Sequence, residues 1–214
     1  GLGVMGYPMA TYLIRSGYDV CVYNRTFLKA KDWVKKNGGS FSDSPRQAVI
    51  NAEIIFVCVG NDDDVRSVIY GVNGILLNAR PGSVVVDHTT ASAELAREIA
   101  LEADKKGIKF LDAPLSGGQA GAEEGKLTIM VGGDESTFNQ VKPVMDVYAK
   151  AITLIGPVGS GQLAKMVNQI CIAGVLQGLS EGLHFANKAD LDVSKVISAI
   201  SKGAAQSWQM ENRW

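Results

Sequence analysis

Cysteine and histidine are scarce in this 214-residue chain. The three cysteines, Cys21, Cys58 and Cys171, are far apart and embedded in apolar runs. An odd number at such spacing excludes a disulfide framework, and we interpret them as buried thiols in a reducing, cytoplasmic compartment. With only two histidines, His88 and His184, and no paired cysteines, no zinc or other metal site is expected.

Charge of one sign and long apolar runs are also lacking. Lys plus Arg number 21 and Asp plus Glu 22, a net charge of −1, which excludes the broad basic footprint of a nucleic-acid-binding protein. The sequence contains no run of about 18 apolar residues. Neither a transmembrane helix nor a signal peptide is therefore predicted, and no membrane partner is expected.

The chain begins inside a glycine-rich turn and ends after a helical pattern. We therefore expect further sequence on both sides, including a preceding first strand.

The length predicts one to two domains. Short apolar runs that predict strands alternate with stretches of helical periodicity. We expect strands at 20–23, 54–59, 84–86, 109–111, 127–131 and 152–155, and helices at 5–16, 26–36, 65–70, 91–106 and 135–148. This alternation predicts a doubly wound α/β fold with a parallel sheet. After residue 157 the pattern becomes wholly helical, at 160–189 and 193–201. We predict an α/β domain over 1–157 and the start of an all-α domain over 158–214.

The first motif is the glycine-rich turn Gly1-Leu2-Gly3-Val4-Met5-Gly6 at the start of a helical pattern. In a G-x-G-x-x-G turn, the first glycine permits the tight turn, the second lets a pyrophosphate approach, and the third allows close packing. The free N–H groups at the start of the helix then bind the phosphates. Gly1, Gly3, Val4, Met5 and Gly6 are therefore candidate dinucleotide-binding residues.

The residues Asn24-Arg25-Thr26 follow the next predicted strand, about 20 residues on, where the ribose-reading residue belongs. An acid there would accept hydrogen bonds from a ribose 2′-hydroxyl, but Asn24 is neutral and Arg25 offers a charge-assisted fork to a phosphate. The pattern favours NADP, with NAD as the other possibility. The alternative is a helix N-cap beside a solvated arginine.

Ligands of an open parallel sheet bind beyond the carboxyl ends of its strands. Val59-Gly60, Thr90 and Ser116-Gly117-Gly118 all lie at or beyond the carboxyl ends of predicted strands, and the last group leaves backbone N–H groups open to an anion. A flexible turn is the alternative for that group. His88 is expected to be hydrogen-bonded within the protein, and the run Asp62-Asp63-Asp64 is expected at a helix N-terminus.

The long helical segment carries Lys165, Asn168 and Gln169 at spacings that place them on one face. Leu163, Met166 and Val167 next to Lys165 are apolar. Burial among them would lower the pKa of the amine until it could exchange a proton with a substrate oxygen. The alternative is a lysine that extends along the helix to water.

Together, five ordered segments resemble the β-hydroxyacid dehydrogenases, a family that includes 3-hydroxyisobutyrate dehydrogenase and tartronate semialdehyde reductase. These segments are residues 1–15, 24–26, 87–90, 112–118 and 159–169. The resemblance implies a Rossmann-type domain, a long interdomain helix and a helical C-terminal domain in a homodimer or homotetramer. It implies that Lys165 is the catalytic acid/base, and that Ser116, Gly117 and Gly118 hold a substrate carboxylate. Asn168 and Gln169 would orient the substrate, a short 3-hydroxy acid or semialdehyde. Val59, Gly60 and Thr90 would flank the cofactor.

Departures from the family pattern bear on the substrate. Asn168-Gln169 replaces the two asparagines of many relatives and is similar to tartronate semialdehyde reductases. 6-Phosphogluconate dehydrogenase has a histidine where Gln162 stands, so a sugar phosphate is not expected. The alternatives are a glyoxylate or succinic semialdehyde reductase, a non-catalytic dinucleotide-binding module and an imine reductase. Retention of Lys165 argues against the last two.

Overall fold

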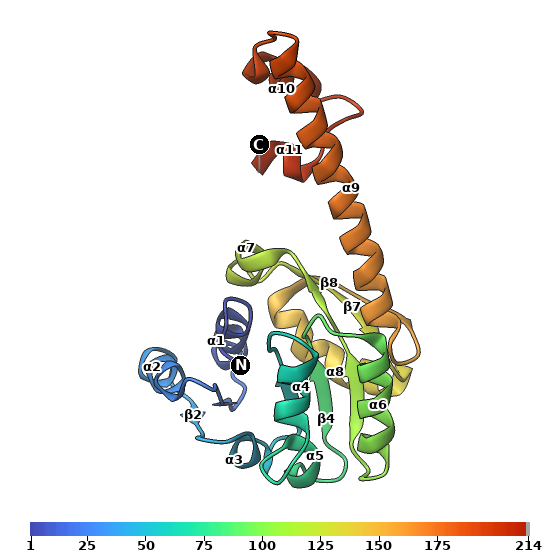
Figure 1. Cartoon of the computed structure of the whole chain (residues 1–214). Helices are drawn as coiled ribbons and strands as arrows, with labels where there is room; N and C mark the ends of the chain where they lie inside the picture. The colour runs from blue at the N-terminus through green and yellow to red at the C-terminus, as the bar shows by residue number, and fades with distance from the viewer. Residues whose placement is uncertain (213–214) are drawn as a thin grey trace. The chain divides into compact units, whose positions relative to one another are not determined.

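The computed structural model describes residues 1–212 and separates into two compact units, Gly1–Lys165 and Met166–Trp214. The first unit begins with the elements α1 (Gly6–Arg15), β1 (Cys21–Val22), α2 (Phe27–Asn37), β2 (Ser40–Phe41), α3 (Pro45–Val49), β3 (Ile54–Val57), α4 (Asp62–Ile69), α5 (Ile75–Asn78), β4 (Val84–Asp87) and α6 (Ala93–Asp104) (Figure 1). It continues with β5 (Lys109–Asp112), β6 (Leu115–Ser116), α7 (Gly118–Glu123), β7 (Leu127–Gly132), α8 (Glu135–Met145), the 3-10 turn η1 (Asp146–Tyr148) and β8 (Ala149–Gly156). Helix α9 (Ser160–Lys188) runs on into the second unit, which also holds α10 (Val193–Ile200) and α11 (Trp208–Asn212).

The first unit holds two sheets. Strands β1 and β2 form a parallel pair, and the larger sheet has the order β3-β4-β5-β7-β6, with β8 paired to β7. Strands β3, β4 and β5 are parallel, and Asp87 is in register with both Val57 and Asp112. The carboxyl ends of these three strands therefore lie side by side, which is the edge where an α/β sheet binds its ligand.

Strand β7 is an exception to the parallel arrangement, because it runs antiparallel to both β5 and β6. The chain between β6 and β7 contains only the short helix α7. A parallel crossover needs a dozen or more residues, so this short connection returns the chain in the opposite direction. Strand β8 is again parallel to β7, because α8 provides a full crossover between them.

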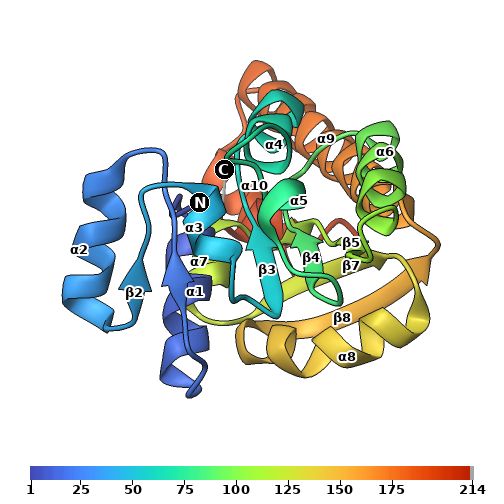
Figure 2. The ribbon, with the colours of Figure 1, turned by 90° about the horizontal axis from the view of Figure 1, so that it is seen from below.

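The large sheet is covered on both faces (Figure 2). On one face, Val84 and Val86 of β4 pack in a core with α1 and α8. On the other face, Val85 of the same strand packs in a core with α3, α4, α5 and α6. Successive side chains of a strand point to opposite faces, so three consecutive valines serve two cores. This arrangement confirms the predicted doubly wound α/β fold.

Several helices begin with a side-chain cap. The side chains of Asn61, Ser92 and Asp134 accept hydrogen bonds from backbone N–H groups in the first turns of α4, α6 and α8. The acidic run 62–64 occupies the first turn of α4, as predicted, where carboxylates interact favourably with the helix dipole.

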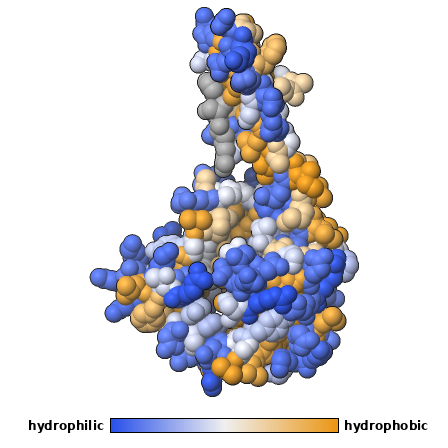
Figure 3. Space-filling view, in the orientation of Figure 1, coloured by the Kyte–Doolittle hydropathy of each residue, from blue (hydrophilic) through white to orange (hydrophobic). Residues whose placement is uncertain are grey.

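The cysteine prediction is only partly right. All three thiols are free, but Cys21 and Cys171 are exposed and Cys58 is half-buried. Cys21 lies in a strand of only two residues. Cys171 lies on α9, and apolar side chains are exposed along this helix (Figure 3). Val167, Ile170 and Phe185 are among these exposed side chains of the second unit. No helix within residues 1–212 is both long and apolar enough to cross a membrane.

Candidate functional site

The glycine-rich turn contains two glycines that have no room for a side chain. A Cβ atom on Gly6 would collide with the carbonyl oxygen of Gly1, and one on Gly1 with the carbonyl oxygen of Cys58. A Cβ atom on Gly3, in contrast, would meet no atom within 4 Å. The turn thus packs closely on its inner side and leaves open space at its middle glycine, as a pyrophosphate requires.

Helix α1 starts in this turn without a side-chain cap: its N-cap residue is Met5. Helix α2 is likewise uncapped at Thr26. The first N–H groups of a helix have no partner within the helix, so both starts can donate to an anion. The open turn and these uncapped starts together fit a dinucleotide.

Asn24 connects β1 to the glycine-rich turn. Its Oδ1 accepts a hydrogen bond from the N–H of Leu2 at 2.9 Å, and its Nδ2 donates to the carbonyl oxygen of Thr26 at 3.0 Å. The amide is thus engaged within the protein and holds the two predicted cofactor segments together.

Arg25 forms an ion pair with an acid of helix α4. Its Nη1 lies 2.9 Å from Oδ1 of Asp64, in the first turn of α4, and the Arg25 side chain is 85% exposed. Lys29 follows in the first turn of α2 and lines a groove of about 590 Å³ with Leu2 and Gly3. Sequence reasoning missed the contact between Arg25 and Asp64, since it interpreted Asp64 only as part of a helix start.

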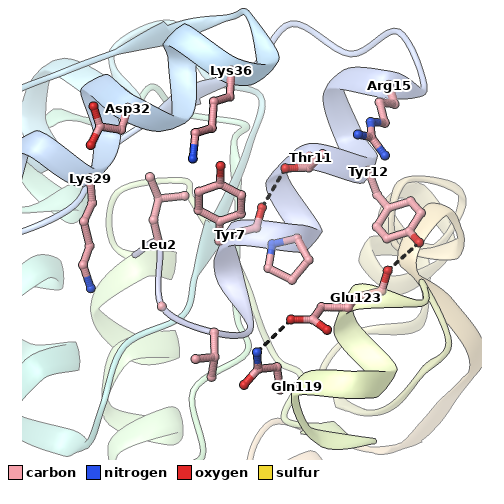
Figure 4. A pocket seen from close by; sticks show the side chains of 13 residues that line it. Leu2, Tyr7, Thr11, Tyr12, Arg15, Lys29, Asp32, Lys36, Gln119 and Glu123 are labelled. Atoms are coloured by element: carbon pink, nitrogen blue, oxygen red, sulfur yellow. Dashed lines mark hydrogen bonds between the residues drawn. The ribbon is translucent and has the colours of Figure 1, made fainter.

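The groove runs between α1, α2 and α7 (Figure 4). Tyr12 of α1 donates a hydrogen bond to the carbonyl oxygen of Glu123 at 2.9 Å and so joins α1 to α7. The groove reaches the predicted cofactor residues Gly3 and Val4, but Lys165 is not among the residues that line it. The groove therefore adjoins residues that the sequence assigns to the dinucleotide.

The loops after β3 and β4 meet at a buried threonine. The N–H of Val59 donates to Oγ1 of Thr89 at 3.1 Å, and the N–H of Thr89 donates to Oδ1 of Asp87 at 2.9 Å. Thr90, the next residue, is exposed. Val59 and Thr90, which sequence reasoning assigned to the cofactor, are thus brought to one edge of the sheet.

Gln162 attaches the first turn of α9 to the same loop. Its Nε2 donates to the carbonyl oxygen of Thr89 at 2.7 Å, and its Oε1 accepts from the N–H of Ala91 at 3.0 Å. A second anchor is Asp112, whose carboxylate accepts from the N–H groups of Gly159 at 2.7 Å and Gln162 at 2.9 Å.

Two glycines permit this close approach of α9 to the sheet. A Cβ atom on Gly161 would lie 2.5 Å from the carbonyl oxygen of Met130, and one on Gly132 would lie 2.8 Å from the N–H of Gly161. Burial raises the pKa of Asp112, although hydrogen bonds from the backbone N–H groups of Gly159 and Gln162 oppose that shift. A buried acid directly after an apolar strand is the sequence signal that could have identified this anchor.

Lys165 lies one helical turn after Gln162, so the two side chains share a face of α9. Only 8% of Lys165 is exposed, and among the described residues it has no hydrogen-bond or ion-pair partner. Burial lowers the pKa of its amine. The predicted apolar surroundings are wrong, however: Leu163, Met166 and Val167 are exposed. Residues one or two positions away on a helix point to other faces, so they do not bury the amine.

The residues predicted to bind the substrate lie in two other parts of the chain. Ser116 ends β6, and Gly117 and Gly118 follow with φ angles of +126° and +61°, a backbone that glycine adopts readily. Asn168 and Gln169 lie on α9 in the second unit, where Asn168 Nδ2 donates to Gln169 Oε1 at 3.0 Å.

His88 is fully engaged in hydrogen bonds, as predicted. Its Nδ1 lies 2.6 Å from the carbonyl oxygen of Ala113, which can only accept, so Nδ1 carries the proton. Its Nε2 then accepts from the hydroxyl of Tyr148 at 2.9 Å. Burial lowers the pKa of His88 to about 4 and raises that of the neighbouring Asp87 to about 7. His88 is therefore a neutral core residue.

Two family profiles cover nearly the whole chain. The NAD binding domain of 6-phosphogluconate dehydrogenase matches residues 1–156, and the NAD-binding domain of NADP-dependent 3-hydroxyisobutyrate dehydrogenase matches residues 159–214. An uncharacterized oxidoreductase of Shewanella frigidimarina is 61% identical over 214 residues, which are 100% of this chain and 74% of that protein.

Relatives whose names state an activity are less similar to this chain. The 2-hydroxy-3-oxopropionate reductase of Escherichia coli is 39% identical over 99% of this chain and 72% of that protein. The structure of Mycobacterium tuberculosis 3-hydroxyisobutyrate dehydrogenase with L-serine superposes with a TM-score of 0.88 at 32% identity, over 97% of this chain and 70% of that one.

Proposed function

The chain belongs to the β-hydroxyacid dehydrogenase family of NAD(P)-dependent oxidoreductases, and from this premise we propose that it interconverts a short 3-hydroxy acid and its semialdehyde with NADP(H). The observation that carries the proposal is Lys165, a buried lysine that has no partner among the described residues and whose pKa burial lowers. A non-catalytic dinucleotide-binding module would have no use for such a group.

The dinucleotide would bind along the carboxyl edge of the sheet. The N–H groups at the uncapped start of α1 would hold the pyrophosphate, and Arg25 would hold a 2′-phosphate. When bound, the nicotinamide supplies the chemistry of hydride transfer. Val59, Gly60 and Thr90 would flank it, at the edge where the loops after β3 and β4 meet.

Lys165 would move the proton of the reaction. In oxidation, the neutral amine takes the proton of the substrate 3-hydroxyl as the carbon loses its hydride, and the C–O bond becomes a carbonyl. In reduction, the ammonium returns that proton to the carbonyl oxygen. Burial of Lys165 makes the neutral amine accessible nearer to neutral pH, which is what a general base requires.

The substrate would be an acid held at Ser116, Gly117 and Gly118. Their open backbone N–H groups and the serine hydroxyl can donate to a carboxylate, and Asn168 and Gln169 would orient it. The relative with L-serine, which bears a carboxylate and a 3-hydroxyl, supports this class. The pair Asn168-Gln169 favours tartronate semialdehyde over 3-hydroxyisobutyrate.

A substrate screen that follows nicotinamide absorbance tests the proposal. The panel contains 3-hydroxyisobutyrate, tartronate semialdehyde, glyoxylate, succinic semialdehyde and a short aldehyde without a carboxylate, each with NADP(H) and NAD(H). We expect the acids to turn over and the plain aldehyde to be poor. Ser116→Ala should raise KM for the acids and leave the plain aldehyde unchanged. Equal kcat/KM for the plain aldehyde would refute a carboxylate site.

A further inference from the structure

The ion pair between Arg25 and Asp64 joins two segments that are 39 residues apart in the chain. Arg25 follows β1, and Asp64 lies in the first turn of α4, with an N–H that donates to Oδ1 of Asn61 at 2.9 Å. The Arg25 side chain is 85% exposed and that of Asp64 28% exposed. The acid is therefore the more firmly placed member of the pair.

Gly60 gives the Asp64 carboxylate its room. A Cβ atom on Gly60 would lie 2.6 Å from Oδ2 of Asp64, so a larger residue would displace the carboxylate. One carboxylate oxygen thus lies over Gly60 and the other meets Arg25. Both Gly60 and Arg25 are residues that we assign to the dinucleotide.

An acid near the adenosine ribose has a definite consequence for the cofactor. It can accept a hydrogen bond from a 2′-hydroxyl, and it repels a 2′-phosphate. In this chain the position of that acid, after β1, is occupied by the neutral Asn24. The fold instead brings the carboxylate of Asp64 to Arg25, the residue that follows Asn24. We propose that Asp64 is a specificity-determining residue, which favours the 2′-hydroxyl of NAD(H) and weakens binding of the 2′-phosphate that Arg25 attracts. This inference rests on the proposed dinucleotide site.

The expected effect of Asp64 on the affinity for a 2′-phosphate follows from simple electrostatics. An exposed ion pair contributes little stability, so Arg25 can exchange Asp64 for a phosphate at small cost. If a phosphate that bears nearly two charges lies on the order of 5 Å from the carboxylate in water, it would bind about tenfold more weakly than beside a neutral group. Salt screens interactions between exposed charges, so the effect should shrink as ionic strength rises.

The test is a fluorescence titration of NADPH and of NADH, each with the native protein, Asp64→Asn and Asp63→Asn. Asp63 is the matched control, because it is exposed in the same helical turn and its substitution changes the net charge equally. We expect Asp64→Asn to raise the ratio of NADPH to NADH affinity about tenfold, and Asp63→Asn to leave the ratio nearly unchanged. Asp64→Ala provides a second variant, and thermal melting confirms that each is folded.

An unchanged ratio in both Asp64 variants, or an equal rise in Asp63→Asn, would overturn the inference. A native protein that prefers NADH would refute the NADP preference proposed above, yet the shift in ratio would still test Asp64. Failure of both dinucleotides to bind any variant would overturn the proposed function and this inference together.

Discussion

The backbone N–H of Gln162 lies 2.9 Å from Oδ2 of Asp112, so a buried carboxylate at the end of β5 holds the first turn of α9. The other oxygen of that carboxylate accepts from Gly159, which directly precedes α9. Lys165 is one turn further along the helix. Its position relative to the Thr89–Ala91 loop therefore depends on an acid that would not touch the substrate.

Replacing Asp112 with Asn should destabilise the first unit. Both carboxylate oxygens accept N–H groups, and an amide would point its NH₂ at one of these donors. We expect the free energy of unfolding to fall by about 1–3 kcal/mol, the cost of a buried donor without a partner. Urea denaturation measures it, with the exposed Asp104→Asn as a control that should change little. A loss equal to that of the control would contradict the anchoring role.

Lys165→Ala should lower kcat by about 10²–10⁴, the usual contribution of a positioned proton donor. Lys165→Arg should restore little, because a guanidinium does not deprotonate in this range. Affinity for NADP(H) should stay near the native value, since the residues proposed to hold its phosphates lie in other elements. Steady-state kinetics and a parallel cofactor titration measure both, with the exposed Lys106→Ala as the control. If Lys165→Ala keeps more than about a tenth of the native kcat, another group transfers the proton.

Arg25→Ala should weaken NADP(H) binding by about 1.5–3 kcal/mol, the contribution of a hydrogen bond to a charged group. Binding of NAD(H) should change little, because it has no 2′-phosphate for the arginine to hold. Fluorescence titration of the two reduced cofactors measures the difference. A similar loss for both cofactors would show that Arg25 contacts a part they share, such as the adenine or the pyrophosphate.

Asp87 and His88 should affect stability in opposite directions as the pH changes. The pKa of Asp87 is raised to about 7, so its contribution is complete at low pH and is lost as the pH rises toward 7. The pKa of His88 is lowered to about 4, so its contribution is complete above its ordinary pKa and is lost as the pH falls. The two dependences therefore largely offset each other between about pH 4 and pH 6.5.

The Asp87→Asn variant should show the pH dependence of stability that is due to His88 alone. The stability of this variant should rise with pH across that window by an amount on the order of 3 kcal/mol, while the native protein changes much less. Urea denaturation at several pH values measures both profiles. If the variant and the native protein have the same profile, burial does not shift these two groups as described.

Local sequence patterns were sufficient to predict most of the longer helices and strands. Helix α9 and strands β3, β4 and β5 lie close to their predicted bounds, because apolar periodicity and turn residues act over a few neighbouring positions. The short elements β2, α3, α5, β6 and α7 were not predicted as separate elements, since segments of two to six residues contain too few residues to show a period.

The sequence by itself determined the glycine-rich turn, the alternation of strands and helices, and the lysine on the long helix, since each depends on residues close together in the chain. Only the tertiary structure decided that Asp64 meets Arg25 and that Asp112 holds the N-terminus of α9. These contacts join residues 39 to 50 positions apart. Which acid reaches which donor over such a distance depends on how the strands are ordered in the sheet, and no local spacing encodes that order.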